Sequence, residues 1–564
     1  MNSKIASSTS QRVALFGKIF TSNLKSKWAE VLIYEKDTII YVGDKAGSEQ
    51  YLNEFTQKIE LNEDHLILPG FIDTHIHYIL GGLQVISNQI KECDSLEAFH
   101  KQLKEFVTKE KDSEWIFAYD YMDIMFPDNK PHKKYLDEIC PDKPIALMRY
   151  DNHTYLVNTK ALEIANITKE TPDPPRGLVE KDKEGNPTGC LHERAMDLVS
   201  EYFPKRKPEE YTNALHASAD IFLKEGITSC TDAMVITRHC QHFQEIYSQQ
   251  SDQLPRASLS ILWNEELEEK INTWKGDKFT LYELLGIPER DKLKVNTVKF
   301  LVDGVLESKT AALEEPYIGK DENDFGIKNF EEDQLNEHVA KLHANGIQAH
   351  FHAIGDRAVR MALDAVEYAK KKAGENTNIK DPRHYIAHNQ IVKERDYKRF
   401  KELGVHTSFS PVWFCTDSES EEVDKLLGFP RARLQYPIKD LMNAGTVVTF
   451  GADWPVTSPR PVDGIETAVT RKLLGNANKD AEPWCPDQCL TVEEAVIIYT
   501  INSAYVGHRE DITGSLEAGK KADIVVLDKD IFKCDPSTIH ETQVRLTIVD
   551  GKVLHNTLKG IEIK

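Results

Sequence analysis

Both ends of the chain show short apolar stretches of the kind that form β-strands. These stretches are rich in β-branched and aromatic residues and are separated by polar turns. The predicted strands are Val13–Phe20, Ala29–Tyr34 and Thr38–Val42 near one end, and Asp523–Leu527, Val544–Val549 and Lys552–His555 near the other. Asp550-Gly551 between the last two is a typical hairpin turn. We therefore expect the two ends to meet in one small β domain.

The middle of the chain follows a different pattern, in which strands and helices alternate. Leu335, Val339 and Leu342 have helical spacing and precede Gly346, a residue typical of helix ends. Such repeated strand–helix units predict a parallel sheet. The candidate strands are Phe71–His77, Gly226–Thr231, Ala257–Leu262, Val298–Val302, Ile347–His352, Tyr385–Ala387, Val405–Phe409 and Thr446–Phe450. Eight is the number of strands that closes a (β/α)8 barrel.

The segment between His77 and Gly226 is far longer than one connecting helix requires. Its aromatic residues and prolines predict an inserted subdomain at about 90–215, which we expect to cover the barrel mouth; the alternative is an appendage lying away from it. The predicted fold is thus α/β, with a TIM-like barrel over 69–512 that carries this insertion. A small β-sandwich domain is expected from residues 1–68 and 513–564.

Composition and charge narrow the class of protein. The chain is 40% hydrophobic and 29% charged, and its net charge of −21 argues against nucleic-acid and acidic-membrane partners. No apolar run approaches the ~20 residues that span a bilayer, and Met1–Arg12 does not resemble a secretory signal. Nine scattered cysteines favour reduced thiols and a cytoplasmic location. Cys485 and Cys489 are interpreted as two free thiols, in preference to a zinc site.

The first chemical motif is a pair of histidines at the end of the first barrel strand. Residues two apart in a strand point to the same face, so His75 and His77 can point inward together. Two neutral imidazoles at this spacing can bind one divalent metal. An isolated pair of this kind is a weak signal, but here Leu-Pro-Gly-Phe-Ile-Asp precedes it.

The nine residues Pro69–His77 resemble the first-strand motif of the amidohydrolase superfamily of metal-dependent hydrolases. Further segments resemble its amidohydrolase-3 branch, which includes YtcJ-like proteins and N-substituted formamide deformylases. These segments are Pro187–Glu193, Gly226–Asp232, Val298–Gly304, Ser308–Leu313, His352–Ala358, Gly451–Val456 and Gly514–Asp523. Because they occur in order from near residue 13 to near residue 555, the resemblance is specific as a set.

The resemblance implies a metal centre whose ligands come from separate strands. The implied ligands are His75, His77, Lys299, His352, His388 and Asp453. His352 is selected by the His-Ala-Ile-Gly-Asp motif, while His350 is interpreted as a hydrogen-bonded core histidine. Ala387 stands where the family usually has an acidic residue, which leaves the ligand His388 intact but alters its surroundings.

Lys299 carries the least certain role among these ligands. In relatives with a lysine at this position, carbon dioxide can carbamylate it, and the resulting carboxylate bridges two metal ions. The alternative is an unmodified lysine paired with Asp303, which shares its strand face, or with another carboxylate in the barrel. The centre is therefore expected to hold one or two divalent metals. Imidazoles and carboxylates suit zinc, and also iron or manganese.

Asp453 is the expected proton carrier. A carboxylate at the end of the eighth strand can ligate a metal, take a proton from the metal-activated water and deliver it to the leaving nitrogen. In isolation, an aspartate there is more simply a helix cap or a turn residue.

Substrate contacts are expected from the insertion and the barrel loops. The candidates are Tyr119, Asp120, Tyr121, His153, Asn158, Asp303, Thr310 and Trp454. Aromatic clusters are commoner in cores than in contacts. For Asp303 and Thr310, hydrogen bonds that structure the loop are an equal alternative to orienting the substrate carbonyl. If the aromatic residues line the pocket, it favours an apolar or aromatic substituent.

The expected activity is hydrolysis of a carbon–nitrogen bond other than a peptide bond, of amide or N-formyl type, in a small, partly apolar molecule. Two alternatives remain open. One is isomerase, decarboxylase or lyase chemistry on the same metal, which would place no solvent oxygen in the product; the other is an inactive binding protein, which would contain almost no metal. A small molecule is the expected partner, and the resemblance suggests a homodimer.

Overall fold

A computed structural model describes residues 12–563 except 91–92, 151, 176, 320–322, 375–378, 380, 416–417 and 476–479. The chain forms two compact units. Unit 1 contains residues 1–77 and 219–564, and unit 2 contains residues 78–218. Among the described residues, no helix has both the length and the apolar character needed to cross a membrane.

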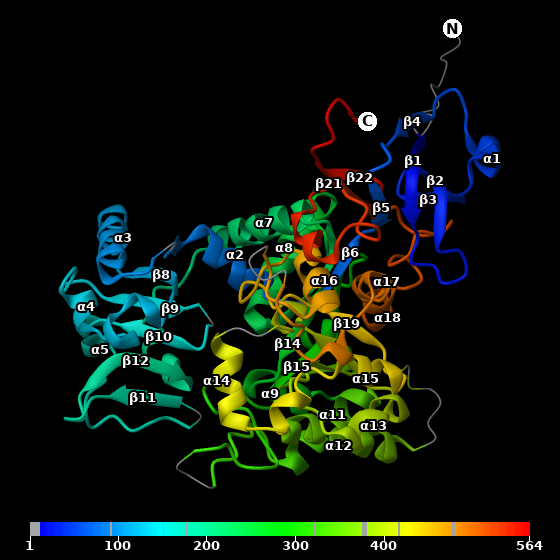
Figure 1. The fold of residues 1–564 in the computed structure, drawn as a ribbon. Coiled ribbons are helices and arrows are strands. Elements are labelled where there is room, and N and C mark those ends of the chain that lie inside the picture. Colours follow the sequence, from blue (N-terminus) through cyan, green and yellow to red (C-terminus); the bar gives the residue numbers. More distant parts are fainter. Residues whose placement is uncertain are drawn as a thin grey trace. The chain divides into compact units, whose positions relative to one another are not determined.

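An eight-stranded, all-parallel sheet forms the centre of unit 1 (Figure 1). Its strands are β6 (Phe71–Ile76), β13 (Ile227–Val235), β14 (Arg256–Leu262), β15 (Leu293–Leu301), β16 (Gln348–Ala353), β17 (Tyr385–His388), β18 (His406–Phe409) and β19 (Val448–Phe450). They neighbour one another in chain order, and a parallel bridge between Ile76 and Trp454 brings the last strand back to the first. The predicted (β/α)8 barrel is therefore confirmed.

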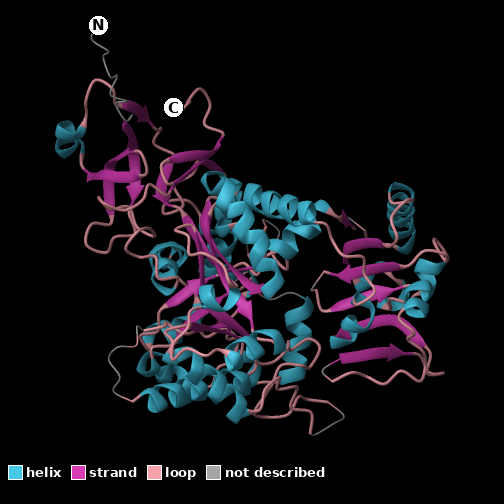
Figure 2. Ribbon diagram, turned by 180° about the vertical axis from the view of Figure 1, so that it is seen from behind, coloured by secondary structure: helices cyan, strands magenta, loops and turns pink. Residues whose placement is uncertain are grey.

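Helices flank the barrel strands (Figure 2). The main ones are α8 (Cys240–Gln250), α9 (Glu265–Thr273), α11 (Glu332–Ala344), α12 (Asp356–Ala373), α13 (Tyr397–Leu403), α15 (Ile438–Asn443), α16 (Pro461–Thr470) and α17 (Val492–Ile497). In α12, Val359, Leu363 and Val366 recur at helical spacing and are buried. The other helices of unit 1 include α1 (Lys45–Ser48), α10 (Leu281–Leu285), α14 (Ser418–Leu427) and α18 (Ser503–Val506).

The largest differences between predicted and observed barrel strands are at β13, which continues to Val235 beyond the predicted Thr231, and at β15. β15 begins at Leu293, five residues before the expected Val298. Lys294 and Asn296 interrupt the apolar run in the sequence, but they alternate with the buried Leu293 and Val295. A strand with one partly exposed face tolerates such polar residues at every second position.

Strands from both chain ends form a second sheet of eight strands in unit 1. They are β1 (Arg12–Phe20), β2 (Trp28–Glu35), β3 (Thr38–Gly43), β4 (Gln57–Glu60), β5 (Leu66–Pro69), β20 (Ile524–Leu527), β21 (Val544–Val549) and β22 (Lys552–Asn556). Antiparallel pairing of β5 with β20 joins the two ends, which lie side by side in Figure 1. Leu15 and Leu32 share one hydrophobic core with Ile524 and Leu546, so neither chain end buries its apolar face alone.

Unit 2 has its own mixed sheet, in the order β11-β12-β10-β9-β8-β7. Its strands are β7 (Asn88–Gln89), β8 (Ile116–Tyr121), β9 (Ile145–Arg149), β10 (Thr154–Val157), β11 (Gly177–Lys181) and β12 (Pro187–Glu193). Its helices are α2 (Tyr78–Ile86), α3 (Leu96–Lys109), α4 (Lys134–Asp137), α5 (Thr159–Ile164) and α6 (Asp197–Ser200), and α7 (Pro208–Lys224) leads back to unit 1. Phe99, Leu136 and Leu147 are fully buried in its core.

A buried ion pair ties the barrel to the terminal sheet. Arg256, the first residue of β14, donates from Nε to Asp523 Oδ2 at 3.0 Å and from Nη2 to Asp523 Oδ1 at 3.3 Å. The same guanidinium also donates to Asp550, in the turn between β21 and β22. Because Arg256 and Asp523 are both 2% exposed, removing one partner leaves the other charged and desolvated.

Replacing Arg256 by methionine is therefore expected to lower the free energy of unfolding by about 3 to 5 kcal/mol. Urea denaturation, followed by tryptophan fluorescence, measures the change. The matched control is Lys224→Met, which breaks an ion pair with Asp220 whose two side chains are 55% and 64% exposed, and should cost less than about 1 kcal/mol. Equal losses in the two variants would contradict a role for the buried pair.

Candidate metal centre

Backbone hydrogen bonds between the first and last barrel strands bring three candidate ligands together. The N–H of Asp453 donates to the carbonyl of His75 at 2.7 Å, and the N–H of His77 donates to the carbonyl of Trp454 at 2.8 Å. Gly451 permits this approach, because a Cβ at that position would lie 2.4 Å from the Cβ of His75. The turn after β19 thus sets Asp453 directly against the end of β6.

The Asp73 carboxylate reinforces the same junction. Its Oδ1 accepts from the N–H of His75 at 2.9 Å, and its Oδ2 accepts from the N–H of Ala452 at 3.0 Å. Burial raises the pKa of Asp73 to about 7, although the two hydrogen bonds oppose the rise. The side chain is therefore a link between β6 and β19 rather than a group exposed to substrate.

Asp453 Oδ1 lies among imidazole nitrogens. The atom is 3.0 Å from His77 Nε2 and 3.4 Å from His75 Nε2. The atom is buried in close contact with both nitrogens. A divalent cation with bonds of about 2.1 Å in tetrahedral geometry holds its ligand atoms about 3.4 Å apart. These two separations are therefore compatible with ligands of one bound cation.

His388 completes the cluster from β17. Its ligand nitrogen, that of His75 and a carboxylate oxygen of Asp453 all lie within 4.8 Å of one another, and all three side chains are buried. His388 and Asp453 both adopt left-handed backbone conformations, with φ of 76° and 57°. Such conformations cost free energy and cluster at functional sites. The Trp413 ring stacks on His388 with centroids 5.5 Å apart.

Lys299 on β15 lies at the deep side of the cluster. Its Nζ is 3.4 Å from His75 Nε2 and 3.2 Å from His350 Nε2. Burial lowers the pKa of Lys299 to about 7, while Asp453 and Asp232 oppose the shift. The same burial, and after it the charge of Lys299, holds the pKa of His75 well below its ordinary value, so this imidazole is neutral.

His350 is a hydrogen-bonded histidine beneath the candidate ligands. Its Nδ1 lies 2.9 Å from the Tyr385 hydroxyl and 3.0 Å from Ser260 Oγ. Its Nε2 lies beside Lys299, a contact that the sequence analysis did not anticipate. Strand alternation would have revealed it, because residues 299 and 350 are direct neighbours in the β15–β16 register.

His352 is placed next to His388 but is turned toward a loop. The two rings are 4.5 Å apart, whereas His352 Nε2 lies 3.0 Å from the carbonyl oxygen of Gly304 and 3.8 Å from Asp303 Oδ1. The structure therefore gathers His75, His77, Lys299, His388 and Asp453 in one cluster, and it places His352 beside His388 with its Nε2 near the carbonyl of Gly304. Its role as a ligand stays a prediction.

Asp303 and Thr310 organise the loop after β15. Asp303 is buried and accepts backbone hydrogen bonds from Ala312, Ile354 and Gly355 at 2.8 to 3.0 Å. Thr310 Oγ1 accepts from the Val305 N–H at 2.9 Å. These are the loop-structuring contacts that the sequence left as one of two readings. No ion pair joins Asp303 to Lys299 in the described part of the chain. If Lys299 is unmodified, its partner is therefore not Asp303.

The aromatic substrate candidates are well packed. Tyr121 is fully buried in the core of unit 2, and the hydroxyl of the buried Tyr119 accepts from Arg206 at 3.2 Å. In unit 1, the Trp454 ring packs edge-on against Phe222 at 5.1 Å. These positions agree with the general tendency of aromatic residues to lie in cores.

The polar candidates of unit 2 have local partners. Asp120, with φ of 71°, accepts from Gln84, and His153 Nδ1 lies 3.0 Å from Glu193 Oε1. Asn158 caps α5 by accepting from the N–H of Ala161 at 3.0 Å. A substrate-binding role for this group stays a prediction.

Sequence reasoning assigned no role to two residues that the structure places beside the cluster. Asp232, in the second barrel strand, is buried and acts electrostatically on Lys299. Trp413, in the short turn after β18, forms an aromatic wall against His388. The sequence could have pointed to Asp232, because it ends the segment Gly226–Asp232 at the level where barrel strands end. No feature of the sequence pointed to Trp413.

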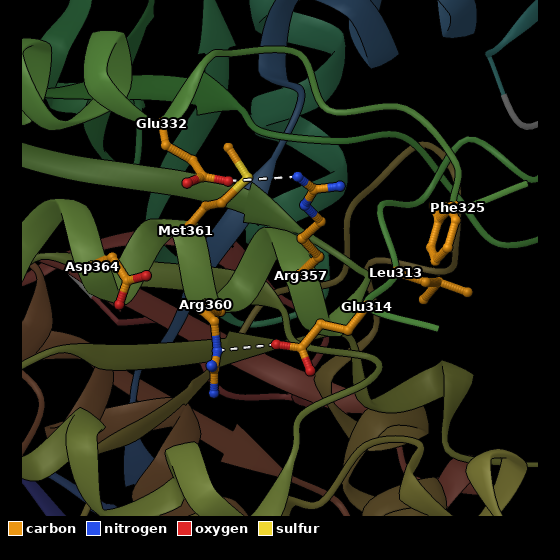
Figure 3. Close-up of a pocket in the computed structure, with 8 residues that line it drawn as sticks. All are labelled: Leu313, Glu314, Phe325, Glu332, Arg357, Arg360, Met361 and Asp364. Carbon is orange, nitrogen blue, oxygen red and sulfur yellow. Dashed lines mark ion pairs between the residues drawn. The ribbon is translucent and has the colours of Figure 1, made fainter. Parts of the chain in front are cut away.

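A separate cavity of about 340 Å³ opens beside α12 (Figure 3). Its rim carries two ion pairs, Arg357 with Glu332 at 3.5 Å and Arg360 with Glu314 at 3.0 Å. None of the candidate ligands lines it. Both guanidiniums are paired with carboxylates.

Three proteins of known sequence resemble most of the chain. Protein LONG AFTER FAR-RED 3 of Arabidopsis thaliana is 30% identical over 96% of this chain and 90% of its own length. Putative amidohydrolase YtcJ of Bacillus subtilis is 26% identical over 96% and 98%. N-substituted formamide deformylase of Arthrobacter pascens is 24% identical over 86% and 87%. These matches confirm the predicted branch.

Comparison of folds and family profiles leads to the same group. An uncharacterized metal-dependent hydrolase of Pyrococcus horikoshii OT3 superposes with a TM-score of 0.73 at 24% identity, covering 93% of this chain and 99% of its own, which supports the fold. The profile of the amidohydrolase family matches residues 63–555. The chain therefore belongs to the amidohydrolase family: it is a hydrolase with a site for a divalent metal.

Proposed function

We propose that this protein hydrolyses a carbon–nitrogen bond, of amide or N-formyl type and not a peptide bond, in a small and partly apolar molecule. The observation that carries the proposal is the buried Asp453 Oδ1, which lies 3.0 and 3.4 Å from two imidazole nitrogens in the cluster that His388 completes. We further propose zinc as the metal, because imidazole nitrogens outnumber carboxylate oxygens in the cluster.

The side chains of the cluster would bind the cation, and one of them would also transfer a proton. His75, His77, His388 and Asp453 would hold the cation, with Lys299 beside them. When bound, a divalent cation lowers the pKa of water and polarises a carbonyl group. Asp453 would accept the proton of the attacking water on its carboxylate and deliver it to the leaving nitrogen. Burial alone would raise the pKa of Asp453, but His77, His388 and Lys299 together hold it below its usual range, so the carboxylate is ionised.

Two features support the choice of substrate class. The Arthrobacter relative is named for the removal of a formyl group from N-substituted formamides. In this chain, the stacked Trp413 offers an apolar surface next to His388, where an N-substituent could lie. We propose Tyr119, Asp120, Tyr121 and His153 as further substrate contacts.

We also propose that Lys299 is carbamylated. Carbon dioxide reacts with a neutral amine, and burial lowers the pKa of Lys299 to about 7, so that much of it is neutral near physiological pH. A carboxylate at its Nζ, 3.4 Å from His75 Nε2, would supply oxygen ligands for a second metal.

The proposed setting is a cytoplasmic enzyme that binds small molecules and acts as a homodimer. The net charge of −21 disfavours polyanionic partners, and the nine cysteines are free thiols.

Metal analysis tests the ligand set. The wild type, purified without chelator, is expected to contain one or two equivalents of zinc by mass spectrometry. His75→Ala should lose most of this metal, because His75 contacts both Asp453 and Lys299. The matched control is His192→Ala, in unit 2, whose imidazole pairs with Glu180 at 3.3 Å and should not affect metal content. Near-zero metal in the wild type would instead favour a binding protein.

Asp453→Asn tests the proton carrier. The variant keeps the shape of the side chain but loses its charge, so turnover of an aromatic N-substituted formamide should fall by about 100- to 10,000-fold with the fold retained. Circular dichroism checks the fold, and ¹⁸O-labelled water should place its label in the released formate of the wild type. Asp220→Asn, at an exposed position of α7, is the control. Full activity of Asp453→Asn would show that Asp453 is not the proton carrier. Product without the ¹⁸O label would indicate a lyase or isomerase.

Lys299→Ala tests the bridging carboxylate. The variant should lose most activity and recover part of it when short carboxylic acids are added, because they can replace the missing carboxylate. Native mass spectrometry of the wild type should show the mass of one added carbon dioxide. Lys294→Ala, on the same strand, should show no dependence on added acid. An unmodified mass in a fully active enzyme would contradict the proposal.

A further inference from the structure

Two histidines outside the candidate metal centre are in direct contact at the beginning of β17. His343 lies in the last turn of α11, and His384 directly precedes β17, whose last residue is His388. His343 Nδ1 is 3.0 Å from His384 Nε2, and the two ring centroids are 5.3 Å apart. His343 is 7% exposed and His384 is 2% exposed. This histidine pair therefore joins the end of a barrel helix to the strand that presents His388.

Hydrogen bonds determine which nitrogens of the pair carry hydrogen. The N–H of Ala349, in β16, donates to His384 Nδ1 at 2.9 Å. A neutral imidazole has one N–H and one acceptor nitrogen, so the hydrogen of His384 is assigned to Nε2. This N–H donates to His343 Nδ1, and the hydrogen of His343 is therefore assigned to its own Nε2. Both acceptor nitrogens of the pair are thus in use.

An added proton has no free position on the pair. On His384 Nδ1 it would face the N–H of Ala349, and on His343 Nδ1 it would face the N–H of His384. In both cases a hydrogen bond is lost and two N–H groups are left against each other. A buried donor without an acceptor costs free energy. The neutral pair therefore fits its surroundings, whereas the protonated pair does not.

The charged and titratable groups around the pair add little to favour a positive charge. They are Lys370 of α12, Asp381 and Arg383 before His384, His406 at the start of β18, and His508 after α18. Burial is the largest effect and lowers the pKa of both histidines, and Lys370 lowers both further. Asp381 opposes the shift at His343, while Arg383 is paired with Glu510 at 2.6 Å.

We propose that the histidine pair is an acid-sensitive switch. When neutral, it holds the beginning of β17 against α11 and β16; when protonated, it releases this strand. β17 has only four residues, and the His384 carbonyl accepts from the N–H of His406, in β18, at 2.9 Å. Release at His384 therefore loosens the strand as far as His388. The inference does not depend on the reaction proposed above.

The direction of the pH dependence follows from the burial of the pair. In the open form, in which the contact between the two histidines is broken, each has an ordinary pKa of about 6.5, whereas in the paired form the pKa of each is lower. The open form therefore binds more protons, and opening becomes more favourable as the pH falls below about 6.5. Above that pH the stabilisation is fully present. Each histidine raises the opening equilibrium by up to about tenfold per pH unit.

Hydrogen–deuterium exchange of the full-length protein tests the switch. Peptides that contain Ala349 or residues 385–388 should lose about 10- to 100-fold of their protection between pH 6.0 and 5.0, relative to a peptide from β14. Protection factors are compared because they remove the direct effect of pH on amide exchange. Return to pH 7 should restore the protection. Parallel changes in all three peptides would overturn the proposal.

His343→Asn leaves only His384 to titrate. Asparagine can place its Oδ1 near the position of the histidine Nδ1, where it accepts from His384 but takes up no proton. The peptide that contains residues 385–388 should then lose about tenfold less protection between pH 6.0 and 5.0 than it does in the wild type. A folded variant with the pH dependence of the wild type would contradict the switch.

The matched control is His338→Asn, on the same helix. The His338 imidazole packs on Trp263, with ring centroids 4.2 Å apart, and its replacement should leave the pH dependence of residues 385–388 unchanged. An equal effect of the two substitutions would indicate opening of α11 as a whole and would overturn the role of the pair. If His343→Asn does not fold, the comparison of wild-type peptides decides without any substitution.

Discussion

The junction between β6 and β19 is the constraint on which the candidate site depends. An eight-stranded parallel sheet becomes a barrel only if its first and last strands meet, and here the Asp73 carboxylate and the Asp453–His75 backbone hydrogen bond make that contact. The same junction sets the carboxylate of Asp453 against two imidazoles. The contacts that close the barrel thus also position candidate ligands, and this gives the buried Asp73 carboxylate a structural role.

The buried side chains around Asp453 form an environment that favours a bound cation. Lys299, His75 and His350 are fully buried neighbours, and burial lowers the pKa of each. These shifts favour neutral nitrogens with available lone pairs, while Asp453 stays ionised. A cluster of neutral nitrogen donors around one carboxylate oxygen is the environment that a divalent metal prefers. His388 and Asp453 have left-handed backbone conformations, and such conformations cost conformational free energy.

The sequence predicted the order of the barrel strands because each buried strand is a run of apolar residues bounded by turns. It also predicted His75, His77 and Asp453 as neighbours through a family motif, since nothing local connects positions 77 and 453. It did not predict that His352 turns toward the carbonyl of Gly304, nor that Asp303 is occupied by three backbone N–H groups. Those contacts depend on how one loop folds over a strand end, which the alternation of side chains along a strand does not specify.

Arg471, which follows α16, and the candidate metal centre are connected by a short chain of aromatic contacts. Arg471 lies over the Phe414 ring, Phe414 directly follows Trp413, and Trp413 stacks on His388. Phe414 also packs against Phe450, three residues before Asp453. Such interiors are close-packed, so a side chain that moves displaces its neighbours. Arg471 is held by the carbonyls of Trp484 and Tyr436, and it therefore fixes the position of Phe414, next to the ring that stacks on His388.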